Sequence, residues 1–554
     1  MSISDYVVTD DLTVLLGLIS VSVFLLHSLY RPQPLVHPIL LGRQSEAGRV
    51  RHPGESAVYR NYGTGLLGRF PVRPEKDLNT VSGFLKPDFD SPRTLWSTKI
   101  TNAQLLERIS AVGTGLIKLT GLVPKESNVL LLLNDSIEFV ISDFALSAHS
   151  IPSFTLSSPK LLSRVLESHP PSVIITHGSF LPHILELVYD AHEHHHTIVV
   201  VGQCDTNLLP KSATQVRIIR WDDVESEGSK GERVSGPAPS QGDVVNVSFF
   251  ESTSGEIQGA QFTHENFTAG VTATRALFPP SNALSSLDTI ASAHSLSTAF
   301  GRVIAYTALF EGASFTTLAT SKLFHVDGEL SLDDIVDIKS AATSSTPSPT
   351  VLFLKPGHVE ALSSSILANA KKSFLFYPFA WRHKLAGVSE GFITRESLWD
   401  RTVFDGAREK VVGQTANTTR TVVVSGGPID LASLTPTRIA LSVPLVNTHS
   451  HPTVAGPVFA SQPLDLQVFP TNSSDKFGTL AHVGAPSINV EAKLVNVQDD
   501  VVEAGGDPVG VIVVRGPPVG SLIEPTENGE GWVNTGETGR VLTNGAFKVL
   551  NTKQ

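Results

Sequence analysis

Short apolar runs alternate with amphipathic stretches from about residue 100 onward, and this alternation limits the possible folds more than any other feature. The run NVLLLL, residues 128–133, is short and continuously apolar, as expected of a strand buried on both faces. Before it, residues 101–119 place Leu105, Ile109 and Leu116 on one face of a helix. The same cycle repeats in SIEFVISDFALSAHS, IPSFTL, LLSRVLESH, SVIITHG, LPHILELVYDAHE and TIVVVG. Strands separated by helical spans predict an α/β fold with a parallel sheet and crossover helices.

Length, charge and cysteine content exclude several classes of protein. A chain of 554 residues is too long for one hydrophobic core, so two or more packed units are expected. The net charge of −11 argues against general attraction to nucleic-acid phosphates, and we predict no nucleic-acid partner. The single cysteine, Cys204, excludes an intrachain disulfide and a CxxC zinc site. His192 and His196 could share a helical face, but no further ligand is placed beside them, so we predict no metal site.

An apolar run at residues 12–30 differs from everything after it. Its length is close to the roughly 20 residues of a membrane-spanning helix. Acidic residues precede the run and basic residues follow it: Asp5, Asp10 and Asp11, then Arg31, Arg43, Arg49 and Arg51. This order favours a transmembrane anchor with the rest of the chain facing the cytosol, over a cleaved signal peptide or a buried helix. The endoplasmic reticulum is the preferred host membrane, and the lipid droplet, the peroxisome and the mitochondrial outer membrane fit as well.

Composition shifts divide the chain into seven parts. They are a short tail (1–11), the anchor (12–30), an extended lead-in rich in Pro, Gly and Arg (31–99), a first α/β part (100–224), a linker-like loop (225–243), a second α/β part (244–460) and a β-rich part (461–554).

The stretch FFESTSGEIQGAQFTHENF, residues 249–267, is the strongest functional motif. DVVNVSFF before it predicts a strand, Glu251–Gly259 a turn, and the residues after Thr263 a helix with Thr263 as its N-cap. Small residues and glycines at a strand-to-helix turn let backbone N–H groups approach phosphate oxygens.

This stretch resembles the phosphate loop of AMP-forming acyl-CoA synthetases, whose usual form is T-S-G-[ST]-T-G-x-P-K-G followed by T-H-x-N. We align the two on Gly255, Gly259 and the residues THEN. This alignment places the family's lysine at Gln258 and its first glycine at Ser252. The resemblance assigns a degenerate nucleotide-binding role to Ser252, Thr253, Ser254, Gly255 and Gly259.

Further segments resemble the long-chain branch of these synthetases, in order, from residue 35 to 554. VVVSGGPID is similar to the adenine-side turn, with Gly426 and Gly427, and TGETG places Glu537 at the ribose-binding aspartate. SAHSLSTAFG places His294 near the family's acyl and nucleotide pockets. The resemblance implies a large N-terminal domain of two α/β sheets plus a distorted β barrel, and a small mobile C-terminal domain. Members of the family join a fatty acid to coenzyme A through an acyl-adenylate, with ATP and magnesium.

Several positions depart from the family pattern. Aligned with G-Y-G-x-T-E, His451 replaces the phosphate-facing threonine and Pro452 replaces the glutamate that holds magnesium. At the hinge, Asn551, Thr552 and Lys553 replace D-R-K, and the sequence ends at Gln554, where we expect the small C-terminal domain to be missing. A carboxylate attacking a polyphosphate needs cations and aimed donors, so these changes predict a pseudoenzyme with no confident catalytic residue.

Three functions remain open. The leading one is a non-catalytic protein that keeps a fatty-acyl or adenine-nucleotide pocket, or offers its surface to a membrane protein. The second is an active long-chain fatty acid–CoA ligase completed in trans by a separate C-terminal domain. Of the three functions, only this one requires ATP or AMP, magnesium and coenzyme A. The third is a structural subunit of an organelle-membrane complex.

Overall fold

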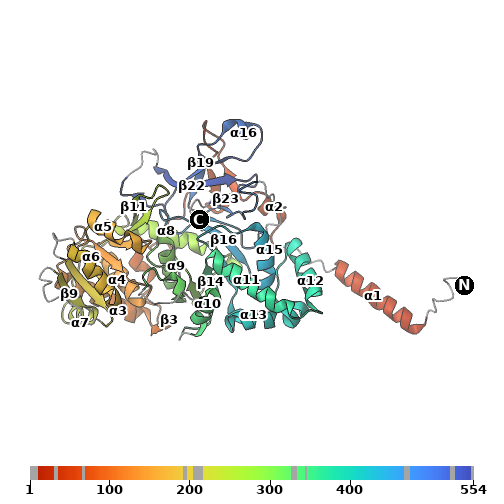
Figure 1. Cartoon of the computed structure of the whole chain (residues 1–554), viewed down its shortest axis with the longest axis horizontal. Helices are drawn as coiled ribbons and strands as arrows, with labels where there is room; N and C mark the ends of the chain where they lie inside the picture. The colour runs from red at the N-terminus through yellow and green to blue at the C-terminus, as the bar shows by residue number, and fades with distance from the viewer. Residues whose placement is uncertain are drawn as a thin grey trace.

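Three sheets and the helices around them form the protein in the computed structural model (Figure 1), which describes residues 10–29, 35–64, 69–190, 196–203, 216–325, 333–343, 346–466, 475–524 and 531–550. The α-helices are α1 (Asp11–Leu29), α2 (Pro38–Gly42), α3 (Asn102–Thr120), α4 (Ile137–Ala148), α5 (Leu162–Ser168), α6 (Leu181–Asp190), α7 (Trp221–Ser229), α8 (His264–Arg275), α9 (Ala299–Glu311), α10 (Asp334–Thr343), α11 (Pro356–Lys371), α12 (Tyr377–Ser389), α13 (Asp405–Val412), α14 (Thr415–Thr418), α15 (Leu431–Leu441) and α16 (Asp499–Glu503).

The first α/β sheet has eight strands. Their order is β21 (Ser521–Leu522), β11 (Ile257–Thr263), β10 (Val244–Glu251), β6 (Ser153–Leu156), β5 (Val129–Leu132), β7 (Val173–His177), β8 (His196–Val201) and β9 (Val216–Arg220). Strands β10, β6, β5, β7, β8 and β9 pair in parallel, which confirms the predicted parallel sheet. All four side chains of β5 are buried, as its continuous apolar sequence indicated.

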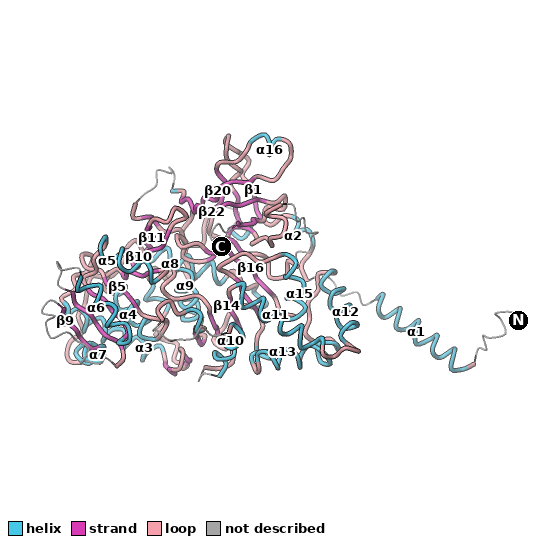
Figure 2. Tube along the Cα trace, viewed as in Figure 1, coloured by secondary structure: helices cyan, strands magenta, loops and turns pink. Residues whose placement is uncertain are grey.

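The second α/β sheet has nine strands. Their order is β18 (Ala485–Pro486), β17 (Pro457–Ala460), β16 (Leu445–Ser450), β15 (Thr421–Val424), β14 (Val351–Leu354), β12 (Thr289–Ser292), β13 (Ser314–Thr317), β3 (Arg93–Leu95) and β4 (Thr98–Ile100). The six strands from β16 to β3 in this order pair in parallel. Figure 2 shows the first sheet on the left of the molecule and the second beside it, each with helices against it.

The third sheet is antiparallel and lies at the top of the view in Figure 1. Its order is β1 (Ser45–Ala47), β2 (Tyr59–Asn61), β19 (Glu491–Val495), β20 (Val509–Arg515), β22 (Val533–Val541) and β23 (Phe547–Leu550). Residues near the start of the chain therefore pair with residues near its end. The short strands β1 and β2 carry no sustained hydrophobic period, so the sequence pattern did not reveal them.

Local capping explains where two predicted helices begin. Thr101 forms a capping box with Gln104 at α3, and Gly121 ends this helix in the left-handed conformation. Thr263 forms a capping box with Asn266 at α8, which confirms Thr263 as the N-cap.

The phosphate-loop region differs from the predicted strand, turn and helix. The turn is shorter than Glu251–Gly259, because residues 257–263 form a second strand, β11, paired antiparallel with β10. A β-hairpin therefore precedes α8. The sequence IQGAQFT concealed this strand because a glycine and two glutamines interrupt its apolar residues.

The predicted transmembrane anchor at residues 12–30 is wrong. Helix α1 forms there, but among the described residues no helix is both long enough and apolar enough to cross a bilayer. The first turn of α1 is polar, since Thr13 donates a hydrogen bond to Asp10 through its side-chain oxygen, at 2.7 Å.

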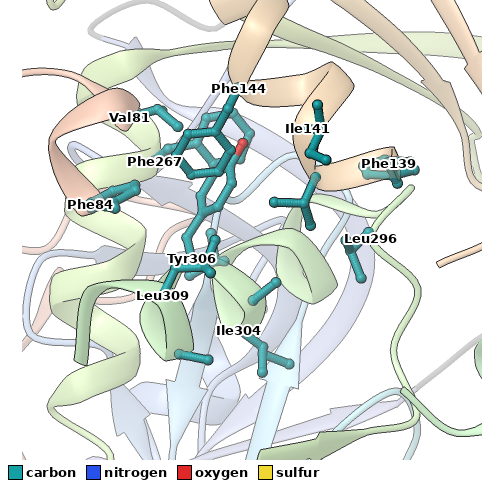
Figure 3. Close-up of a cluster of buried hydrophobic side chains, with 14 of the residues drawn as sticks. Val81, Phe84, Phe139, Ile141, Phe144, Phe267, Leu296, Ile304, Tyr306 and Leu309 are labelled. Carbon is teal, nitrogen blue, oxygen red and sulfur yellow. The ribbon is translucent and has the colours of Figure 1, made fainter. Parts of the chain in front are cut away.

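Aromatic packing around α9 joins the two α/β sheets (Figure 3). The ring of Tyr306 lies 5.3–5.4 Å, centroid to centroid, from those of Phe84, Phe144 and Phe267. The Tyr306 hydroxyl donates to buried Asp143 on α4, and Arg302 pairs with the same carboxylate. Burial next to Asp143 raises the pKa of Tyr306 well above its ordinary value. This core holds the sheets in the relative position that forms the site described below.

A close contact between α8 and the segment after β16 requires a glycine. A Cβ atom on Gly270 would lie 2.0 Å from the carbonyl oxygen of Ala455. We therefore expect Gly270→Ala to lower the free energy of unfolding by about 1–3 kcal/mol, the usual cost of overpacking. Gly406→Ala in α13, where a Cβ would meet nothing within 4 Å, is the control and should gain about 0.5–1 kcal/mol from helix propensity. Urea unfolding of both variants measures the difference, and equal stability of the two would contradict the contact.

Candidate functional site

A cavity of about 440 Å³ lies where the three sheets meet. Its wall consists of Phe250, Glu251, Ser252, Thr253, Ser254, Gln258, Gly426, Gly427, His449, Ser450, His451, Pro452, Leu522, Asn534, Thr535, Gly536 and Glu537. Five separate segments supply these residues: the β10–β11 hairpin, the turn after β15, the end of β16 with the residues that follow it, Leu522 of β21, and the strand β22. The fold thus brings together most of the positions that the sequence resemblance had assigned to the nucleotide.

Three of the assigned residues lie outside this wall. Gly255 has φ 86° and closes the hairpin turn, so its role is to permit the left-handed backbone. Gly259 lies in β11, where a Cβ would be 2.4 Å from the end of the Ile523 side chain, so its place is set by packing against that side chain. His294 lies behind the wall: a Cβ on Gly426 would be 3.4 Å from its ring.

The hairpin turn satisfies much of its own hydrogen bonding. The backbone N–H of Ser252 donates to the Glu256 carbonyl at 2.8 Å, and that of Gly255 donates to the Ser252 carbonyl at 3.0 Å. The Glu256 N–H donates to the Ser252 hydroxyl at 3.2 Å, and this hydroxyl also pairs with that of Ser254 at 2.7 Å. A phosphate would have to compete with these bonds for three of the turn's backbone donors.

The turn is also packed against β22. Gly536 has φ 70°, and a Cβ there would lie 2.7 Å from the Thr253 hydroxyl. This contact holds the hairpin close to Glu537, at the opposite side of the cavity. The close approach brings the hairpin turn next to β22.

The charge on the cavity wall is negative. Two carboxylates line it, Glu251 and Glu537, and no lysine or arginine is among its described lining residues. Gln258, at the position of the family's lysine, is opposite Phe250 in the β-ladder and contributes no charge. Coulomb repulsion between Glu251 and a polyphosphate opposes binding unless cations are supplied, whereas Glu537 is paired with a histidine of the same wall.

Glu537 is paired with a histidine that the sequence analysis had not singled out. Nε2 of His449 lies 2.7 Å from a carboxylate oxygen of Glu537, and both side chains are mostly buried. Burial raises the pKa of Glu537, but the charge and hydrogen bond of His449 outweigh it, and the pKa lies below its ordinary value. The only sequence signal was the close spacing of His449 and His451, which lie at the end of β16.

His451 and Pro452 occupy the positions of the family's threonine and magnesium-binding glutamate. The His451 ring is buried, with Nε2 donating to the Thr535 carbonyl at 3.1 Å and Nδ1 2.7 Å from the Thr453 hydroxyl. Burial lowers the pKa of His451, so the ring is held neutral between these two partners. Pro452 has no side-chain donor atom, and within the described part of the chain no group of three His, Cys, Asp or Glu side chains could hold a metal ion.

His294, the candidate for an acyl pocket, is in packed surroundings. Its ring meets that of Phe300 edge-on at 5.0 Å, and burial lowers its pKa to about 3. The hinge residues Asn551–Lys553 and most of the histidine group at 192–196 lie outside the described residues.

Comparison with known proteins agrees with this geometry. The sequence pattern of the AMP-binding enzyme family matches residues 90–522. Human long-chain-fatty-acid–CoA ligase 1 is 27% identical over 372 residues, which are 64% of this chain and 48% of the human protein. Rat long-chain-fatty-acid–CoA ligase 5 is 24% identical over 474 residues, 82% of this chain and 64% of the rat protein. The chain thus spans about half the length of the human relative.

Solved structures share the fold. An anthranilate CoA ligase in complex with anthranoyl-AMP superposes with a TM-score of 0.61 at 16% identity, over 86% of this chain and 78% of the other. A long-chain-fatty-acid–CoA ligase from Archaeoglobus fulgidus gives 0.58 at 14% identity, over 87% of this chain and 86% of the other. The coverage of both chains also corrects the prediction that the family's small C-terminal domain is missing. Because the family pattern matches more than half of the chain and the sheets carry the corresponding fold, this protein belongs to the AMP-binding enzyme family.

Proposed function

We propose that this chain is a long-chain acyl-CoA synthetase-like protein of fatty-acid metabolism whose nucleotide cavity does not bind magnesium–ATP productively. The protein then forms no acyl-adenylate by itself and acts through lipid or nucleoside binding, or as a scaffold. The observation that carries this proposal is the cavity wall, with two carboxylates and no lysine or arginine among its described residues. Adenylation needs positive charge where the triphosphate lies, and this wall supplies negative charge.

Two further features support the proposal. The hairpin turn uses its Ser252, Gly255 and Glu256 N–H groups internally, and Pro452 stands where the family has its magnesium ligand. The adenosine side keeps its glycine turn at Gly426 and Gly427 and a carboxylate at Glu537. An uncharged nucleoside would avoid the repulsion that a triphosphate meets. Location at the cytosolic face of an organelle membrane stays a prediction.

Calorimetric titration of the full chain with magnesium–ATP and with adenosine tests the proposal. We expect no magnesium–ATP binding at micromolar concentrations. The double variant Glu251→Ser/Gln258→Lys removes one negative charge from the wall and adds one positive charge, so its affinity for ATP should rise about tenfold or more. The control, Gln498→Lys, adds one positive charge at a different cavity and should leave ATP binding unchanged.

Micromolar, magnesium-dependent ATP binding by the unmodified chain would contradict the proposal and favour an active ligase. In that case, acyl-CoA formation from ATP, a long-chain fatty acid and coenzyme A should be measured with the full chain. No binding of ATP, adenosine or long-chain fatty acid would leave the scaffold function.

A further inference from the structure

The turn between α11 and α12 exposes a cluster of large apolar side chains. Phe374, Leu375, Phe376 and Phe379 form what we call the aromatic tip, and they are 74%, 63%, 57% and 64% exposed. Three of them are consecutive, so the tip is a contiguous surface and not a scatter of single residues. Exposed apolar surface of this kind marks an interaction site.

The tip is presented by well-packed helices. On the inner side of α11, Leu362, Ile366 and Ala370 are buried in the core of the second α/β sheet, as are Ala380 and Val388 of α12. Phe379 stacks on Trp399 with ring centroids 6.4 Å apart, and Tyr377 lies against Trp381 at 6.0 Å. The exposed side chains of the tip are therefore held in place by packed helices and by contacts among neighbouring aromatic rings.

Positive charge surrounds the tip. Lys371 and Lys372 precede it, Arg382 follows it, and all three residues are exposed. No acidic residue occurs between 371 and 382, although the chain as a whole has a net charge of −11. The basic surface is thus local, and its complement is a negatively charged partner.

We propose that the aromatic tip and its flanking cations dock on the surface of an anionic phospholipid bilayer. Phenylalanine and leucine would enter the acyl boundary, tyrosine and tryptophan would lie at the headgroup level, and lysine and arginine would contact lipid phosphates. The docking is peripheral and requires no helix to cross the bilayer. A second copy of this chain fits less well, because an isologous contact would bring the same cations of both copies together.

Binding of the full chain to sedimented vesicles tests the proposal, with vesicles of phosphatidylcholine alone and of phosphatidylcholine with phosphatidylserine. Every variant keeps α1, so any contribution of that apolar helix is constant. We expect preference for the phosphatidylserine vesicles. Phe374→Ser/Leu375→Ser/Phe379→Ser should weaken this binding about tenfold or more, because the three apolar side chains that would be buried in the bilayer are removed. Lys371→Glu/Lys372→Glu should weaken it about tenfold and remove the preference for phosphatidylserine.

Leu287→Ser is the control, because Leu287 is 90% exposed and belongs to a different segment, just before β12. It should bind vesicles as the unmodified chain does. Unchanged binding of the tip variant would overturn the proposal and assign the affinity to another segment. A dimer in light scattering that the tip substitutions abolish would also overturn it, in favour of a second copy as occupant. Neither outcome depends on ATP, so this test and that of the proposed function fail independently.

Discussion

Asp400→Ala is expected to lower the free energy of unfolding by about 3–5 kcal/mol, the cost of leaving a buried charge unpaired. The Asp400 side chain is fully buried, forms an ion pair with Lys384 and lies 3.0 Å from an Arg408 nitrogen. Both cations are themselves buried. Removal of the carboxylate leaves two desolvated positive charges between α12, α13 and α15, where water cannot replace the lost partner.

Asp405→Ala is the control for this prediction. Asp405 pairs with the same Arg408 at 2.9 Å, but its side chain is 38% exposed, so the loss should be about 0–1 kcal/mol. Urea unfolding, with the slope checked for constancy, measures both variants. A loss below 1 kcal/mol for Asp400→Ala would show that the two cations find other partners. The double variant Lys384→Met/Asp400→Leu should recover part of the stability, because it removes the buried charge of Lys384 together with the carboxylate, and the remaining Arg408 still pairs with Asp405.

Acidification from pH 6.5 to 4 is expected to destabilise the fold through two buried histidines. Burial lowers the pKa of His264 to about 4 and that of His294 to about 3. In the unfolded chain each imidazole has its ordinary pKa of about 6.5 and takes up a proton as the pH falls below it, while the folded protein keeps the ring neutral. The stability is therefore complete above pH 6.5 and is lost as the pH falls towards the folded pKa. At about 1.4 kcal/mol per pH unit, each histidine contributes a loss of roughly 3 kcal/mol by pH 4.

His264→Asn isolates one of these contributions. Nδ1 of His264 accepts a hydrogen bond from the Val81 N–H at 3.1 Å, and the asparagine oxygen occupies a similar position without titrating in this range. The variant should lose about 3 kcal/mol less than the unmodified chain between pH 6.5 and 4. His52→Asn, at an exposed histidine, is the control and should keep the full acid loss. Equal acid losses in all three proteins would contradict a neutral, buried His264.

The α/β character was predictable because it rests on local periodicity. The continuous apolar residues of β5, β7 and β8 and the one-sided pattern of α3 are visible in single short segments. The hairpin partner β11 was not, because Gln258, Gly259 and Gln261 break its pattern and its strand conformation depends on pairing with β10 and β21. The apolar composition of residues 12–30 was equally visible, but composition alone overestimated its capacity to span a bilayer.

The candidate site also has features that the sequence determined and features that only the tertiary structure decided. Sequence alone determined which chemical groups are present, such as the amide of Gln258 and the ring of Pro452 where the family pattern has a cation and a carboxylate. Only the tertiary structure decided which groups meet. His449 and Glu537 are 88 residues apart, and their contact arises because β16 and β22 converge on one cavity. In the same way, the aromatic tip faces outward because the opposite sides of α11 and α12 fill the core. The amino-acid sequence determines the chemical group at each position. Burial and long-range contacts depend instead on packing between segments that are far apart in the sequence, and no local pattern relates these segments.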